Sequence, residues 1–99
     1  MMNLRINPLV VTDLKSIKDY IAEDNVQKAN ETVAKIYSKF ENIQLFPDMG
    51  TDLSKRVSFR TDYNYAVWNN YVIIYKIREE YVEIYRVINR YQDITKIFD

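Results

Sequence analysis

Three residues near the C-terminus carry side chains that can do chemistry: Arg86, Arg90 and Tyr91. Arg86 lies in a segment predicted to form a strand, in which the alternate positions on both sides of it are apolar. An arginine in such a place either pairs with an acid, such as Glu83 or Asp93, or faces an anionic ligand. Because most charges on a sheet face are structural, the pattern favours pairing. The two residues that follow add a second cation and a phenol close to the same place.

A second basic group, Lys55, Arg56 and Arg60, belongs to a run predicted to form a neighbouring strand. Cations on a rigid surface can stabilise a charged phosphorane, and a tyrosine or lysine with a shifted pKa can move protons. RNA cleavage through the 2′-hydroxyl needs little more than these groups. The chain contains no histidine and no cysteine, so the usual general base and thiolate ligands are missing. We therefore expect no metal and no cofactor.

Tyrosine is unusually frequent, with nine residues, most of them in the predicted strands. The plain explanation is that tyrosine suits half-buried sheet faces. An alternative is a protein interface, where tyrosine and tryptophan are enriched, and on this basis we predict partner contacts for Trp68, Tyr65 and Tyr75. A platform for base stacking is less favoured, because no basic residues are threaded between the rings.

Composition limits the class of protein. Ninety-nine residues make one domain, spanning 1–99, and 14 basic residues balance 14 acidic ones. Neutrality argues against a strongly basic nucleic-acid binder. No run approaches the roughly 20 apolar residues of a membrane span, and the N-terminus has no signal-peptide pattern. We expect a cytoplasmic protein.

The elements that must position these groups follow from periodicity. Alternation predicts an N-terminal strand closed by Pro8, and helical spacing predicts a helix capped by Thr12 and a second helix ending at Pro47. Strands are predicted at 55–60, 63–68, 71–77 and 81–88, with turns at 69–70 and 78–80 and a helical turn at 94–98. The expected fold is an α+β sandwich of two layers: an N-terminal strand, a helical hairpin, and an antiparallel meander of three to four strands. We expect the hairpin to cover one sheet face and the other face to meet solvent or a partner.

Four stretches together resemble a known group, the RelE/ParE superfamily of toxins from bacterial type II toxin–antitoxin modules. They are PLVVTDLKSIKDYIAEDN (8–25), LFPDMG (45–50), YVIIYKI (71–77) and VEIYRVINRYQDI (82–94). The resemblance implies a growth-arresting toxin wrapped by an antitoxin. It implies one of two activities: RelE-like members cut mRNA in the ribosomal A site, whereas ParE-like members poison DNA gyrase.

The resemblance also implies residue roles. Arg86 falls where RNA-cleaving members have a phosphate-stabilising arginine on the last strand, and Arg90 and Tyr91 fall near their C-terminal polar residues. The group Lys55, Arg56 and Arg60 falls near their earlier basic cluster. The chain departs from the pattern at Asn89, where many relatives have histidine, and at Val72, where RNA-cleaving members often have arginine.

The sequence prediction is thus a type II toxin that cleaves mRNA on the ribosome, with gyrase poisoning as the alternative and a degenerate toxin that only binds its antitoxin as a third. In the nuclease, Arg86 stabilises the phosphate, Tyr91 transfers protons, and Arg90 and Lys55 position RNA. The expected partners are a cognate antitoxin, forming a hetero-oligomer, and the ribosome with mRNA, or gyrase in the alternative. We expect the antitoxin to cover the tyrosine-rich sheet face and Trp68.

Overall fold

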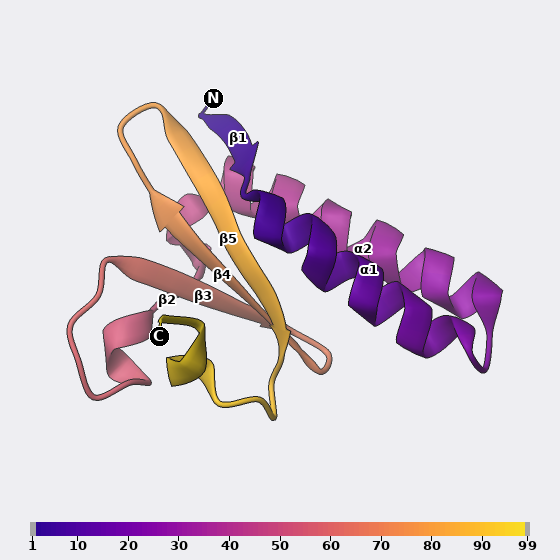
Figure 1. Cartoon of the computed structure of the whole chain (residues 1–99). Coiled ribbons are helices and arrows are strands. Elements are labelled where there is room, and N and C mark those ends of the chain that lie inside the picture. The colour runs from indigo at the N-terminus through magenta and orange to yellow at the C-terminus, as the bar shows by residue number, and fades with distance from the viewer. Residues whose placement is uncertain (1, 99) are drawn as a thin grey trace.

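The computed structural model describes residues 2–98, which form a mixed five-stranded sheet with a helical hairpin on one face and two short 3-10 helices on the other (Figure 1). No helix within these residues has the length and apolar character needed to cross a membrane. The elements in chain order are β1 (Asn3–Ile6), α1 (Pro8–Ala22), α2 (Val26–Leu45), η1 (Pro47–Met49), β2 (Thr51–Asp52), η2 (Leu53–Lys55), β3 (Tyr63–Trp68), β4 (Tyr71–Ile77), β5 (Tyr81–Asn89) and η3 (Ile94–Phe98).

The sheet has the order β1-β5-β4-β3-β2. β1 runs parallel to β5, and the remaining neighbours are antiparallel. The predicted turn between β3 and β4 is confirmed: Asn69 has a φ of 54°, in the left-handed region that asparagine tolerates better than most residues. The predicted α+β fold, with its N-terminal strand, two helices and antiparallel strands, is confirmed.

The two helices begin at asparagine caps. Asn25 Oδ1 accepts the Lys28 N–H at 2.9 Å at the start of α2, and α2 ends just before Pro47 as predicted. The prediction that Thr12 caps the first helix is wrong. The cap is Asn7, five residues earlier, and α1 begins at Pro8, because Asn7 Oδ1 accepts the Leu9 N–H and proline is well suited to the first helical turn.

The main core lies between the helical hairpin and the sheet. Burial there follows the helical spacing, so each helix turns one apolar stripe to the strands. Its buried members are Val10 and Leu14 from α1, Ile36, Phe40 and Ile43 from α2, and Ile73, Tyr75, Val82, Ile84 and Val87 from the sheet.

The chain itself covers a large part of the opposite sheet face, so the expectation that this whole face meets solvent or a partner is wrong, although Asn3 and Arg5 of β1 stay exposed on it. A second apolar cluster lies there, with η2 and η3 packed over it. Phe98 of η3 lies against Tyr63 and Tyr85, with ring centroids 5.3 and 6.2 Å apart. The buried members of this second core are Leu53, Val72, Ile74, Ile88 and Ile94.

The predicted strand at 55–60 is also wrong. The segment leaves η2 as a loop, because Leu53 is buried in the second core while most of the residues after it stay exposed. Ser54 Oγ closes this loop by accepting the Thr61 N–H at 2.9 Å and donating to the Thr61 carbonyl at 3.0 Å.

Candidate functional site

Arg86 of β5 is held by Asp13 of α1. Its Nε donates to Asp13 Oδ2 at 2.8 Å and its Nη2 to Oδ1 at 2.9 Å. The Val87 N–H donates to the same Oδ2 at 3.0 Å, at a point of β5 beyond the end of its pairing with β1. We call this group the Asp13–Arg86 clamp. The hydrogen bonding of Arg86 to the Asp13 carboxylate raises the pKa of Arg86 above its already high ordinary value.

The predicted ion pair of Arg86 is therefore present, but both predicted partners, Glu83 and Asp93, are wrong. A register shift in the β4–β5 ladder leaves Tyr85 without a partner, so the alternation along β5 breaks just before Arg86. Arg86 then reaches α1, 73 residues away in the sequence. A guanidinium that binds a phosphate offers two N–H groups to two oxygens, and here the Asp13 carboxylate occupies the Nε and Nη2 edge in this way.

Arg90 and Tyr91 lie in an exposed turn after β5. The Arg90 N–H donates to the Asn70 carbonyl at 2.7 Å, and its guanidinium lies 5.7 Å from the centroid of the Tyr91 ring. The Tyr91 side chain is 80% exposed. Arg86 and Arg90 line two adjoining depressions beside α1, which share Tyr20, Asn70 and Tyr71.

The other predicted basic residues lie over the second core, on the sheet face opposite α1. Lys55, Arg56 and Arg60 are exposed in η2 and the loop after it. The Arg56 guanidinium lies 5.3 Å from the centroid of the Tyr65 ring. The sheet thus separates these three cations from the Asp13–Arg86 clamp.

The predicted aromatic face does not exist as one surface. Tyr75 is fully buried in the main core, so its predicted place on an open face is wrong. Trp68 packs on the main core beside Tyr71, whereas Tyr65 packs on the second core. Trp68 and Tyr65 therefore lie on opposite faces of β3, and a partner segment on one face reaches only one of them.

Similarity to known proteins gives the family. The family model described as the ParE toxin of type II toxin–antitoxin system, parDE, matches residues 4–94. The chain belongs to this ParE toxin family. Among solved structures, the fold is similar to a chromosomal ParDE toxin–antitoxin system from P. aeruginosa, with a TM-score of 0.75 over 90% of this chain and 96% of that chain at 18% identity. A comparison with curated proteins gives no match. The predicted membership of the RelE/ParE superfamily is confirmed.

Sequence reasoning missed two residues that organise the ParE-family chain. Asp13 is one of them, and its partner on β5 lies 73 residues away, so it leaves no local signal in the sequence. Gly50 donates its N–H to the Tyr75 hydroxyl at 3.0 Å, and that hydroxyl donates to the Pro47 carbonyl at 2.7 Å. Gly50 is the only glycine of the chain, which was the available signal. Within residues 2–98, no three acidic side chains gather in a way that could hold a metal ion.

Proposed function

We propose that this ParE-family toxin arrests growth by binding DNA gyrase, the target implied for the ParE branch, and not by cutting mRNA. This reverses the order that the sequence favoured. The observation that carries the proposal is the Asp13–Arg86 clamp. The arginine that would stabilise a phosphate in a nuclease is neutralised by a carboxylate that also holds the backbone of β5.

The positions of the other nuclease candidates support the same proposal. Cleavage needs a phosphate-binding cation and a proton-transfer group within reach of one scissile bond. Tyr91 lies in solvent beyond the end of β5, and Lys55 lies across the sheet from Arg86. A toxin that acts by binding needs no such convergence, only an exposed surface, and α1 offers one with Leu9 and Val11 exposed on it.

We propose further that a cognate antitoxin neutralises this toxin in a hetero-oligomer. Membership of the ParE family supports this, since the family description names a two-component system. The surfaces available to the antitoxin differ from the single aromatic face expected from the sequence, because Trp68 and Tyr65 face opposite ways.

The test is induction of the chain from a tight promoter, with transcript cleavage and DNA breakage followed in one culture. Broken DNA with intact messages, together with cleaved plasmid when purified toxin is added to gyrase, is the expected result. In-frame cuts in translated messages with intact DNA would overturn the proposal. Absence of both effects would identify a chain that only binds its antitoxin.

Substitutions at exposed residues test the nuclease alternative directly without disturbing the core. We expect Tyr91→Phe, and the combined change of Lys55, Arg56 and Arg60 to alanine, to leave gyrase poisoning unchanged. Tyr37→Phe, at a partly exposed tyrosine on α2, serves as a matched control. Loss of toxicity in the Tyr91 variant alone would favour the nuclease.

A further inference from the structure

The outer flank of β5 is covered by another strand over only part of its length. β1 lies beside it as far as Ile84, which pairs with Ile6. The chain then leaves the sheet for α1, so within residues 2–98 no strand lies beside residues 85–89 on the side away from β4. We call this stretch the β5 edge. An open depression of about 510 Å³ borders it, so a strand of another chain could reach its backbone.

The register shift in β5 falls at the first residue of the β5 edge. The β4–β5 ladder skips Tyr85, which has no partner on β4 while the residues on both sides of it are paired. An extra residue of this kind bends a strand and increases its twist, which makes an edge a poor template for another strand. The irregularity therefore begins where the cover by β1 ends.

Side chains bind the backbone groups that the rest of the β5 edge turns outward. Asp13 Oδ2 accepts the Val87 N–H at 3.0 Å, and Gln92 Oε1 accepts the Asn89 N–H at 2.8 Å. The Asn89 carbonyl accepts the Gln92 N–H at 3.0 Å. Arg86 holds the Asp13 carboxylate in place with two hydrogen bonds. A carboxylate from α1 and a residue after β5 thus make the bonds that a neighbouring strand would make.

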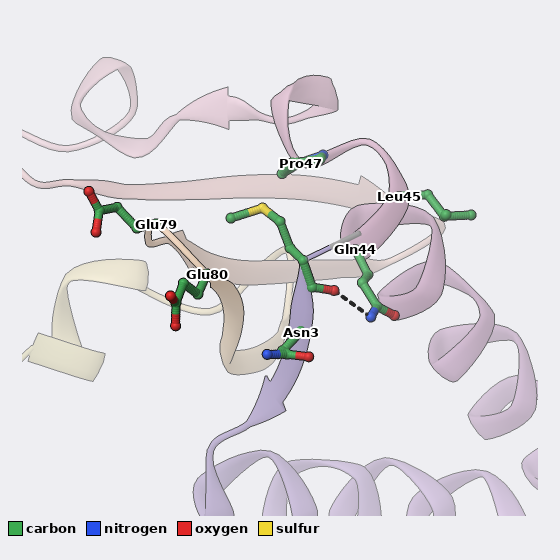
Figure 2. Close-up of a pocket in the computed structure, with 7 residues that line it drawn as sticks. Asn3, Gln44, Leu45, Pro47, Glu79 and Glu80 are labelled. Atoms are coloured by element: carbon green, nitrogen blue, oxygen red, sulfur yellow. Dashed lines mark hydrogen bonds between the residues drawn. The ribbon is translucent and has the colours of Figure 1, made fainter.

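The outer flank of β1, at the other end of the same side of the sheet, is closed in a similar way. Asn3 donates its N–H to a β5 carbonyl at 2.9 Å, so its neighbours Met2 and Leu4 turn their backbone groups away from β5. Gln44 of α2 donates its Nε2 hydrogen to the Met2 carbonyl at 2.7 Å, as Figure 2 shows. The stretch without such a cap, Leu4 to Ile6, is only three residues long and offers little to another strand.

We infer that the Asp13–Arg86 clamp and Gln92 seal the β5 edge against strand addition by a second copy of this chain. A second copy is the partner because it brings the same edge. Two such edges can pair antiparallel about a two-fold axis, with Val87 of one copy opposite Asn89 of the other. The clamp thus has a role besides stability, in which Arg86 positions the Asp13 carboxylate. The seal works whatever target the toxin binds.

The test opens the β5 edge with the double change Asp13→Ala plus Gln92→Ala. In sedimentation velocity below the unfolding temperature, we expect the wild type to stay one species at every concentration and the double variant to form dimers as its concentration rises. The matched control, Asp13→Asn plus Gln92→Glu, keeps an oxygen for each N–H and should stay monomeric. Arg86→Met is a second control, since it loses the ion pair but leaves Asp13 beside the Val87 N–H.

Hydrogen exchange measured by NMR shows whether the association uses the β5 edge. In the dilute double variant, the Val87 and Asn89 amides should exchange about tenfold faster than in the wild type, because each has lost one hydrogen bond. Both amides should regain protection in the dimer. Gln92→Ala alone changes an exposed residue and leaves the clamp and the core intact, so it should speed exchange at Asn89 only.

Several results would overturn the seal. One is a double variant that stays monomeric with both amides exchanging rapidly, and another is a dimer in which the two amides remain unprotected. Unchanged exchange at Val87 and Asn89 in the variants would show that the side chains do not hold these groups. Equal association of the Asp13→Asn plus Gln92→Glu control or of Arg86→Met would assign the effect to lost stability, and a wild type that dimerises through these amides would contradict the seal directly.

Discussion

Replacing Asp13 with alanine should unfold this protein at a much lower temperature. The change removes the acceptor of two hydrogen bonds from Arg86 and one from the Val87 N–H. A buried donor left without a partner costs about 1–3 kcal/mol, and a hydrogen bond to a charged group contributes about 1.5–3 kcal/mol. The Arg86 side chain remains 22% exposed and can partly rehydrate, so we expect a loss of about 3 kcal/mol in the free energy of unfolding.

Thermal unfolding followed by circular dichroism measures this loss. For a domain of this size, about 1 kcal/mol lowers the Tm by roughly 4–8 °C, so the Asp13→Ala variant should melt about 12 °C or more below the wild type. Asp13→Asn keeps one oxygen for the Val87 N–H, so its Tm should lie between those of the wild type and the Asp13→Ala variant. Asp19→Ala, at an exposed position of the same helix, is the control and should change the Tm little.

A double-mutant cycle with Arg86→Met separates the pair from the rest of the helix. We expect the two single changes to be strongly non-additive, by about 1.5 kcal/mol or more, because both break the same contact. A coupling energy near zero, or an Asp13→Ala variant as stable as Asp19→Ala, would refute the clamp as a stabilising contact. It would also remove the main support for excluding the nuclease.

Three further predictions concern the backbone and the buried tyrosine. Gly50→Ala should cost about 1–3 kcal/mol in thermal unfolding, because a Cβ there would meet the Tyr75 hydroxyl and lie 2.7 Å from the Tyr65 carbonyl oxygen; a wild-type Tm would contradict this. Burial raises the pKa of Tyr75, so its folded pKa lies above its unfolded one; this contribution to stability is fully present below about pH 10 and is lost as the pH rises through the folded pKa. Burial also raises the pKa of Tyr71, so tyrosinate absorbance should show late titrations of both tyrosines, and Tyr75→Phe should remove one of them; an unchanged late titration in that variant would refute the assignment. Because φ at Asn69 is 54°, Asn69→Gly should leave the free energy of unfolding nearly unchanged, whereas Asn69→Val should lower it by about 1–2 kcal/mol in urea unfolding. Equal stability of the two variants would argue against the turn.

The helices and the central strands were predictable because their signals are local. The turn at 69–70 is one example, and the stop of α2 before Pro47 is another. Both depend on residues within a few positions of each other, so a single sequence contains the whole signal. The antiparallel meander of β3, β4 and β5 followed from the same local elements, but the parallel pairing of β1 with β5 was not predicted, because the paired residues are distant in the sequence.

The candidate site was less predictable because its contacts are distant in sequence. Tyr75 carries an alternating strand pattern like its neighbours, and only the position of Gly50, 25 residues earlier, shows why it is buried. Tyr85 is an extra residue in the β4–β5 ladder, so it interrupts the alternation of β5 from which the surroundings of Arg86 were predicted. Alternation at 55–60 indicated a strand, but the burial of Leu53 in a second core turned that segment into a loop.

The pairing of β1 with β5 has a consequence for synthesis. Asn3 lies opposite Tyr81, 78 positions later, so β1 cannot pair until β5 has been synthesised. On the ribosome, α1 and α2 emerge early but cannot join their sheet until residues 81–84 have left the exit tunnel. Contacts of such long separation also slow folding. The sheet therefore cannot close until β5 has emerged, however early the two helices form.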